Sequence, residues 1–223
     1  MGDFQKERMI ISVAWKWLGG HKVESASIPK YYGYKNVLAK NKKLVELIHS
    51  LFSAADILVA QNGDAFDIKR CNSEFIKHGL KPPSTYKSVD TLKVARQKFG
   101  FNSNKLDDIG ATLGLGRKKH TGGFKLWQDC INGNRKAWNK MIAYNEQDVV
   151  LLEKIYLKLR PWMTTHPNMN AIDGGEGCTK CRSNNLNREG FTLSNQGRRQ
   201  RYSCKDCGNW MASTMIMSGN TLR

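Results

Sequence analysis

Four cysteines near the end of the chain constrain its fold more than any other feature. They form two Cys-x-x-Cys pairs, Cys178 with Cys181 and Cys204 with Cys207, separated by 22 residues. Two such pairs at this spacing are typical of a structural zinc site, in which each pair directs two thiolates at one ion. The alternative is two disulfides in a secreted protein. The N-terminus lacks the apolar segment of a signal peptide, so we predict a Zn²⁺ ribbon over residues 178–223.

The charge balance indicates a polyanionic partner. The 223 residues include 36 Lys and Arg against 19 Asp and Glu, a net charge of +17, and nucleic acid is the polyanion that such a surface most often binds. The longest apolar run is far shorter than a membrane helix requires. We therefore expect a cytoplasmic protein that binds nucleic acid, with a generically basic protein as the alternative.

Ahead of the cysteines, strand and helix patterns alternate, which predicts an α/β domain. We predict a domain over residues 1–163, a linker over 164–177 and the zinc ribbon over 178–223. Within the first domain we expect a hairpin over 9–28 and a buried parallel strand over 57–60. We also expect a helix that begins after an N-cap at Asp90, and four further helices over 41–54, 66–78, 105–113 and 135–159.

Two aspartates occupy unusual positions: Asp148 lies on an apolar helix face, and Asp67 lies near the end of a predicted strand. On the long helix, Asp148 lies in the middle of a largely apolar face, and Tyr144 lies one turn before it on the same side. A hydrogen-bonded structural Asp is the alternative to a functional one there. The segment Asn62–Asp67 follows the 57–60 strand, at the edge where open α/β sheets place their sites. We interpret Asp64 as a helix cap and Asp67 as a candidate site residue.

These motifs resemble those of a nuclease superfamily. Asn62-x3-Phe66-Asp67 is similar to the second motif of the DEDD 3′–5′ exonucleases, and Tyr144-x3-Asp148 to their third motif in the tyrosine form of proofreading domains. The segments from Val89 and from Lys105 resemble connecting segments of the small prokaryotic and phage branch. The resemblance covers residues 9–162 and implies an RNase H-like mixed sheet flanked by helices.

The resemblance also implies a chemistry. Such enzymes hold two Mg²⁺ or Mn²⁺ ions between four carboxylates; one ion activates water and the other stabilises the leaving 3′-oxygen. Asp67 and Asp148 would be two of these ligands, Tyr144 would orient the attacking water, and Asn62 would be a positioning residue. The implied function is a metal-dependent 3′–5′ exonuclease acting on nucleic acid, with DNA as the expected substrate.

The first motif of the superfamily, Asp-x-Glu on the first central strand, is absent. Asp3 and Glu7 are four positions apart where the motif requires two. We therefore expect an N-terminally incomplete domain that lacks this strand and is weakly active or inactive, with a complementing N-terminal segment or a replication polymerase among its partners. The alternatives are a non-catalytic nucleic-acid-binding protein with a remnant nuclease fold and a transposase-like endonuclease.

Two basic segments are candidates for phosphate contacts. One precedes the second cysteine pair, in a stretch similar to the zinc ribbons of transposases, and the other is a charge run in a loop of the main domain, where a solvated loop is the alternative. Arginine supplies the forked donors that bind phosphate. The candidate residues are Arg198, Arg199, Arg201, Lys118 and Lys119.

Overall fold

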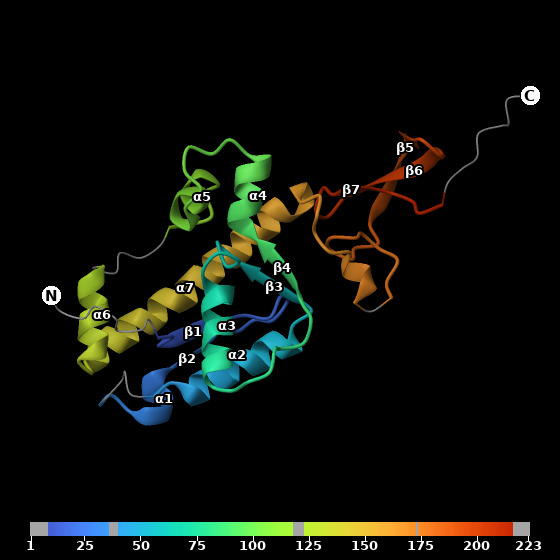
Figure 1. Cartoon of the computed structure of the whole chain (residues 1–223). Coiled ribbons are helices and arrows are strands. Elements are labelled where there is room, and N and C mark those ends of the chain that lie inside the picture. Colours follow the sequence, from blue (N-terminus) through green and yellow to red (C-terminus); the bar gives the residue numbers. More distant parts are fainter. Residues whose placement is uncertain (1–8, 36–39, 118–122, 173, 216–223) are drawn as a thin grey trace, which may run out of the picture. The chain divides into compact units, whose positions relative to one another are not determined.

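The computed structural model describes residues 9–35, 40–117, 123–172 and 174–215, which divide between two compact units (Figure 1). The first unit ends at Tyr156 and the second begins at Leu157. None of the helices in the described ranges is long and apolar enough to span a membrane.

The helices of the first unit follow the sequence pattern closely, and four of the expected helices are confirmed to within two residues. Helices α1 and α6 were not expected; α1 has only five residues, too few for a helical periodicity to be detected. The last residues of α7 belong to the second unit. In the described chain the elements are β1 (Ser12–Trp15), β2 (Glu24–Ser27), α1 (Ile28–Tyr32), α2 (Lys42–Ala54), β3 (Ile57–Ala60), α3 (Asp67–Lys77), β4 (Lys87–Asp90), α4 (Thr91–Lys98), α5 (Leu106–Thr112), α6 (Phe124–Ile131) and α7 (Arg135–Leu159).

The strands of this unit form two separate pairs. Strands β1 and β2 make the expected antiparallel hairpin, with Ser12 opposite Ser27. Strands β3 and β4 pair in parallel, with Ile57 opposite Lys87. Within the described residues neither pair is hydrogen-bonded to the other. Strand β3 is half-buried rather than buried. Having a partner on one edge only, it has the burial of an edge strand, which the apolar run 57–60 did not indicate.

The core of the first unit packs helices against the β1–β2 hairpin. Trp138 of α7, Leu44 of α2 and Ile28 of α1 are fully buried, and the Trp138 Nε1–H donates to the Cys130 carbonyl at 2.8 Å. Cys71 and Cys130 are buried. Burial raises their pKa values to about 12 and about 11, so both are neutral packing residues.

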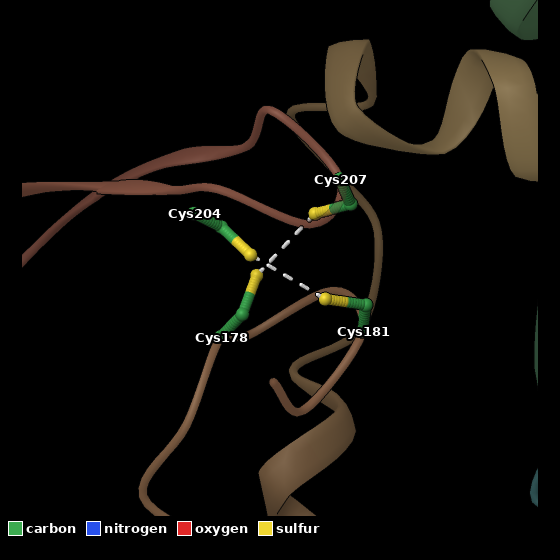
Figure 2. A group of neighbouring side chains, drawn as sticks. All are labelled: Cys178, Cys181, Cys204 and Cys207. Carbon is green, nitrogen blue, oxygen red and sulfur yellow. Dashed lines mark hydrogen bonds between the residues drawn. The ribbon is translucent and has the colours of Figure 1, made fainter. Parts of the chain in front are cut away.

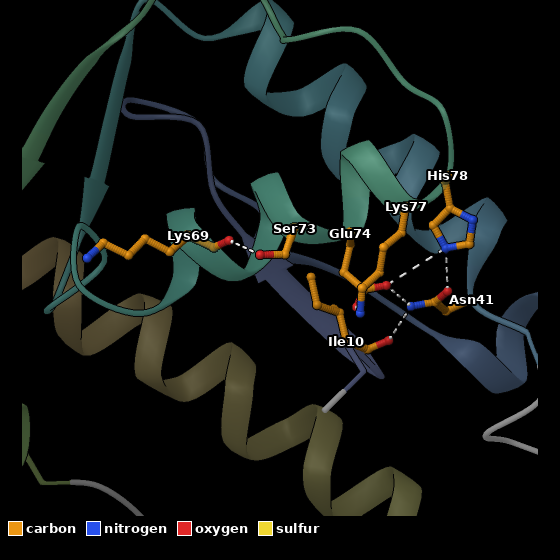
Figure 3. Close-up of polar contacts among 7 residues, drawn as sticks. All are labelled: Ile10, Asn41, Lys69, Ser73, Glu74, Lys77 and His78. Carbon is orange, nitrogen blue, oxygen red and sulfur yellow. Dashed lines mark hydrogen bonds and ion pairs between the residues drawn. The ribbon is translucent and has the colours of Figure 1, made fainter. Parts of the chain in front are cut away.

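A buried polar network fixes α3 to the chain that leads into β1 (Figure 3). Asn41 Nδ2 donates to Glu74 Oε2 at 2.8 Å and to the Ile10 carbonyl at 3.4 Å. The His78 ring nitrogen Nε2 lies 2.8 Å from Asn41 Oδ1. Because Glu74 lies two turns after Asp67 on the same helix, the network fixes the helix whose first residue is a candidate ligand.

The second unit contains a three-stranded antiparallel sheet in the order β5-β6-β7, formed by β5 (Leu186–Ser194), β6 (Gly197–Cys204) and β7 (Trp210–Ala212). Two 3₁₀ turns, η1 (Arg160–Trp162) and η2 (Met169–Ala171), precede it. The segment expected as a linker over 164–177 includes η2 and the buried residues His166, Met169 and Asn170. Part of it is therefore packed structure, which its Gly-rich composition did not indicate.

Candidate functional site

The loop after β3 is held by Asp90, at the end of the neighbouring strand β4. Asp90 is the confirmed N-cap of α4, accepting from the Leu92 N–H at 3.0 Å. The same carboxylate accepts from the N–H of Asn62 at 2.8 Å and from that of Asp64 at 3.4 Å. Asn62 adopts a left-handed backbone with φ of 61°. It is thus the turn residue that lets the loop close on Asp90.

Asp67 begins α3, one turn beyond this loop. A carboxylate in the first helical turn is favoured by the helix dipole. Its Oδ2 lies 4.0 Å from the position that a Gly63 Cβ would occupy. Partial desolvation, and then the nearby Asp90 charge, raise the pKa of Asp67. Two carboxylates therefore meet at the C-terminal ends of β3 and β4, and the sequence identified Asp90 only as a cap.

Asp64 has a different role from the helix cap that we expected, and that prediction is wrong. Helix α3 begins after Phe66 without a side-chain cap. Asp64 instead accepts from Lys93 Nζ at 2.6 Å and from the Ser88 hydroxyl. These two hydrogen bonds lower its pKa. The ion pair with Lys93 spans 29 residues of sequence, so no local pattern could indicate it.

Helix α7 carries the second candidate ligand beside the β1–β2 hairpin. Asn145 Nδ2 donates to the Ser12 hydroxyl at 2.7 Å, and Ser25 of β2 donates to Glu146 at 2.6 Å. Asp148 follows Asn145 by three residues and is half-buried. Tyr144 lies one turn before Asp148 on the same side of the helix. The contacts at Asn145 and Glu146 therefore orient the helix at the level of Asp148.

Helix α5 approaches the same part of α7 closely. A Cβ on Gly110 would lie 2.8 Å from the Leu151 side chain and 2.7 Å from the Gly116 carbonyl. Gln147 Nε2 also donates to the Arg117 carbonyl at 2.9 Å. Lys118 and Lys119, which follow in the chain, lie outside the described residues.

The candidate carboxylates are not gathered into a multi-ligand centre. Among the described residues the only group of three or more potential ligands with all ligand atoms within 4.8 Å is the set of four cysteines. Asp67 and Asp148 lie on separate helices, and no third acidic group joins either of them in such a cluster. The described carboxylates alone thus do not make up the two-metal site that the resemblance implies.

The four cysteines of the second unit do converge (Figure 2). The Sγ atoms of Cys178 and Cys207 are 3.6 Å apart, as are those of Cys181 and Cys204. Around a tetrahedral Zn²⁺ with bonds of about 2.3 Å, sulfurs lie about 3.8 Å apart. The donor set and its spacing therefore fit a zinc ion, which would hold the two cysteine turns together.

The two cysteine turns have the same backbone design. The first cysteine of each pair accepts through its carbonyl from the N–H four residues later, from Arg182 in one turn and Gly208 in the other. Its own N–H donates to the carbonyl five residues later. Arg182 and Gly208 both have left-handed backbones, with φ of 64° and 77°. Repetition of this turn places two sulfurs from each pair at one centre.

Hydrogen bonds favour a thiolate at one of the four cysteines. Although burial opposes ionisation, the backbone N–H groups of Cys181 and Lys180 lower the pKa of Cys178 to about 7. The buried Lys180 ammonium donates to the His166 carbonyl at 3.2 Å. Burial, together with the charges of Lys180 and Arg160, lowers the pKa of His166 to about 4. The histidine is therefore neutral at pH 7, and the lysine supplies the positive charge beside the sulfurs.

The three predicted arginines lie on β6, where successive side chains point to opposite faces. Arg198 therefore lies on one face and Arg199 and Arg201 on the other. The Arg198 guanidinium lies 4.6 Å from the centre of the Phe191 ring, and that of Arg201 lies 5.0 Å from the Trp210 ring. The arginines thus form two basic surfaces rather than the single patch that their adjacency in sequence suggests.

The sequence of the first unit matches a known protein family. A model of the RNase_H_2 family, of the RNase H superfamily, matches residues 14–160, about two thirds of the chain. No curated protein matches the sequence. The matched range contains the candidate residues from Asn62 to Asp148 and excludes the four cysteines.

Proposed function

Because the chain belongs to the RNase H superfamily, we propose that it is a metal-dependent 3′–5′ exonuclease acting on nucleic acid, with DNA as its substrate. In this proposal a Zn²⁺-bound ribbon over residues 178–223 contributes substrate binding. The main domain supplies Asp67 and Asp148 as ligands for Mg²⁺ or Mn²⁺, Tyr144 as the residue that orients water, and Asn62 as a positioning residue.

The observation that carries this proposal is the placement of Asp67. It begins a helix at the C-terminal edge of the β3–β4 pair, has its Oδ2 atom 4.0 Å from the Cβ position of Gly63, and has a raised pKa that Asp90 helps to cause. Repulsion between two carboxylates is relieved when a divalent cation binds between or beside them. The side chain is exposed, so a hydrated ion and a phosphate have access to it.

The described residues supply too few carboxylates for a two-metal mechanism. A two-metal mechanism requires ions about 4 Å apart with ligands shared between them, and the described residues bring no three acidic groups together. Within the described part of the chain the two strand pairs are also not joined to each other. We propose that a further strand bearing Asp-x-Glu would pair between them and supply the other two ligands.

The experiment is a degradation assay on a labelled single-stranded oligonucleotide, with product lengths read by electrophoresis. We expect residues 1–223 to show little or no activity. Adding a peptide or fused segment that carries a strand and Asp-x-Glu should produce Mg²⁺- or Mn²⁺-dependent loss of 3′ nucleotides. In that completed protein Asp67→Ala and Asp148→Ala should reduce the rate by about 10³-fold or more, because one-sided metal binding cannot support an in-line displacement.

Two controls keep the assay specific. Asp64→Ala removes a neighbouring carboxylate that is paired with Lys93 and should leave activity within a few-fold. Tyr144→Phe should reduce but not abolish activity, because the ring remains and only the hydroxyl is lost. Robust activity of residues 1–223 alone would contradict the ligand count, and an inactive completed protein would contradict the exonuclease assignment.

One observation favours a second candidate function. The only ligand cluster in the described residues is in the second unit, where the arginine-bearing strand also lies. A non-catalytic nucleic-acid-binding protein with a remnant nuclease fold would need that unit alone. Binding that persists while the completed protein stays inactive would support this alternative.

A further inference from the structure

The β5–β6–β7 sheet carries aromatic rings that are exposed to solvent instead of being buried in a core. Trp210 is 56% exposed and Phe191 is 42% exposed. Each ring lies on a different face of the sheet, and each is contacted by one arginine. An arginine on one side of a ring still leaves the other side open. Exposed rings beside cations are the arrangement that proteins use to stack unpaired nucleic-acid bases.

The face that carries Trp210 is the better equipped of the two. Trp210 lies opposite Ser203 in the β6–β7 register, and Ala212 lies opposite Arg201. Residues two apart on a strand share a face, so Arg199, Arg201 and Trp210 all lie on it. The three strands together carry four arginines and one acidic residue, Glu189.

A bulge in β5 holds Arg201 in place against the ring. The register shifts between Arg188 and Phe191. The Glu189 carbonyl, exposed by the bulge, accepts from Arg201 Nε at 2.9 Å. Gln200 Nε2 similarly donates to the Gly190 carbonyl at 2.8 Å. The Arg201–Trp210 pair is therefore ordered before any ligand arrives, which lowers the entropy cost of binding.

Arg199 completes this face as a phosphate contact. Its Nε is buried and has no hydrogen-bond partner in the described structure. It lies across from Thr192 and two residues from Arg201. A stacked base at Trp210 would therefore share its face of the sheet with two guanidinium groups, and guanidinium groups bind phosphate oxygens as forks.

We propose that the Trp210–Arg201–Arg199 face of the ribbon binds single-stranded nucleic acid, with an unpaired base stacked on Trp210 and the backbone phosphates on the arginines. This deepens the proposed function, because it names the substrate form that the ribbon accepts. Duplex ends offer the same phosphates, but their bases are already stacked on one another and cannot use the ring. The ribbon therefore selects single strands through Trp210.

The test uses the full chain with zinc and measures fluorescence anisotropy of a labelled dT20 strand and of a 20-base-pair duplex over a range of salt. Trp210→Ala should weaken dT20 binding about tenfold without changing the slope of log affinity against log salt, because stacking releases no counterions. Duplex binding should stay within twofold. Trp210→Phe should restore most of the single-strand affinity.

The matched control is Phe191→Ala, which removes the ring of the other arginine pair from the opposite face of the same sheet. It should change dT20 affinity by less than twofold. Metal analysis of each variant, expected to give one zinc per chain, separates loss of the ring from loss of the fold. Equal affinities for dT20 and duplex, or an unchanged affinity in Trp210→Ala, would overturn the proposal. Because binding is read without cleavage, neither outcome depends on whether the nuclease is active.

Discussion

The two candidate metal sites differ in how much of each lies within one local stretch of chain. The four cysteines come from two turns of identical design, and their sulfurs converge to within 4.8 Å. The carboxylates Asp67 and Asp148 come from helices about 80 residues apart in sequence, beside two strand pairs that the described residues do not join. The cysteine ligands are positioned by the turns that contain them. The carboxylates are positioned by distant parts of the chain, so their site is complete only when every strand of the sheet is present.

The largest effect should follow from removal of metal from the cysteine site. Because so small a sheet has little core, its folding depends on the ion, and zinc binding to such modules contributes about 10–16 kcal/mol. We expect one zinc per chain by metal analysis. A strong chelator should release it and abolish the near-ultraviolet circular dichroism of Trp210.

Cys204→Ser should reproduce the effect of chelation, and Cys71→Ser is the matched control, since Cys71 is a buried cysteine outside the cluster. That control should retain the zinc. A ribbon that stays folded without metal would contradict the prediction that the cysteine site depends on zinc for its structure.

The sequence predicted all four members of the cysteine cluster but only some of the contacts around the candidate carboxylates, for the same reason. Cysteine pairs two residues apart define their own turn, so spacing alone locates all four ligands. Asp67 and Asp148 became candidates because the first follows a strand end and the second lies on a largely apolar helix face. The clamp that Asp90 makes on the Asn62 loop joins positions 28 residues apart, and the Asp64–Lys93 pair joins positions 29 apart. Such contacts are set by tertiary packing and leave no local pattern.

A second prediction concerns where nucleic acid binds. Replacing Arg198, Arg199 and Arg201 together by alanine should weaken binding of a single-stranded oligonucleotide about 10- to 100-fold in moderate salt. The slope of log affinity against log salt should fall by up to about 2, at about 0.7 per phosphate contact. If the main domain instead dominates binding, the triple variant will keep the slope of the parent protein.

Separating the two faces sharpens this result. Arg199 and Arg201 share the face of Trp210, and Arg198 lies on the other. The double variant Arg199→Ala with Arg201→Ala should therefore account for most of the lost slope, and Arg198→Ala alone for little. Equal contributions per arginine would indicate that both faces contact the strand.

The third prediction tests whether the two cysteine turns are equivalent. Gly208 and Arg182 hold the same left-handed position, and nothing lies within 4 Å of a Cβ placed on Gly208. Gly208→Ala should therefore cost only backbone strain, about 1 kcal/mol of unfolding free energy. Arg182→Gly should relieve a similar strain. The melting temperature of the zinc-loaded protein should therefore fall in Gly208→Ala and rise in Arg182→Gly. Shifts in the same direction would show that the turns are not equivalent.

The smallest effects lie in the loop beside Asp67, where two aspartates have opposite pKa shifts. The pKa of Asp67 is raised by desolvation and by Asp90, so its ionised form is disfavoured in the folded protein. Asp67→Asn should therefore raise the unfolding free energy at pH 7 by a few tenths of a kcal/mol, a small gain because the side chain is exposed. The gain should vanish as the pH falls below the ordinary value of 3.8, where Asp67 is protonated in both states.

Asp64→Asn provides the opposite sign in the same loop. Hydrogen bonds from Lys93 and Ser88 lower the pKa of Asp64, so its ionised form stabilises the fold. That stability is present above the ordinary Asp pKa and is lost as the pH falls through the lowered one. The variant should thus lose about 0.5 kcal/mol at pH 7 and little at pH 2. Denaturant titrations at pH 7 and pH 2 would measure both variants. A destabilised Asp67→Asn would mean that Asp67 serves the fold, whereas a stabilised one would mean that the fold tolerates an unfavourable charge at the position where the proposed metal would bind.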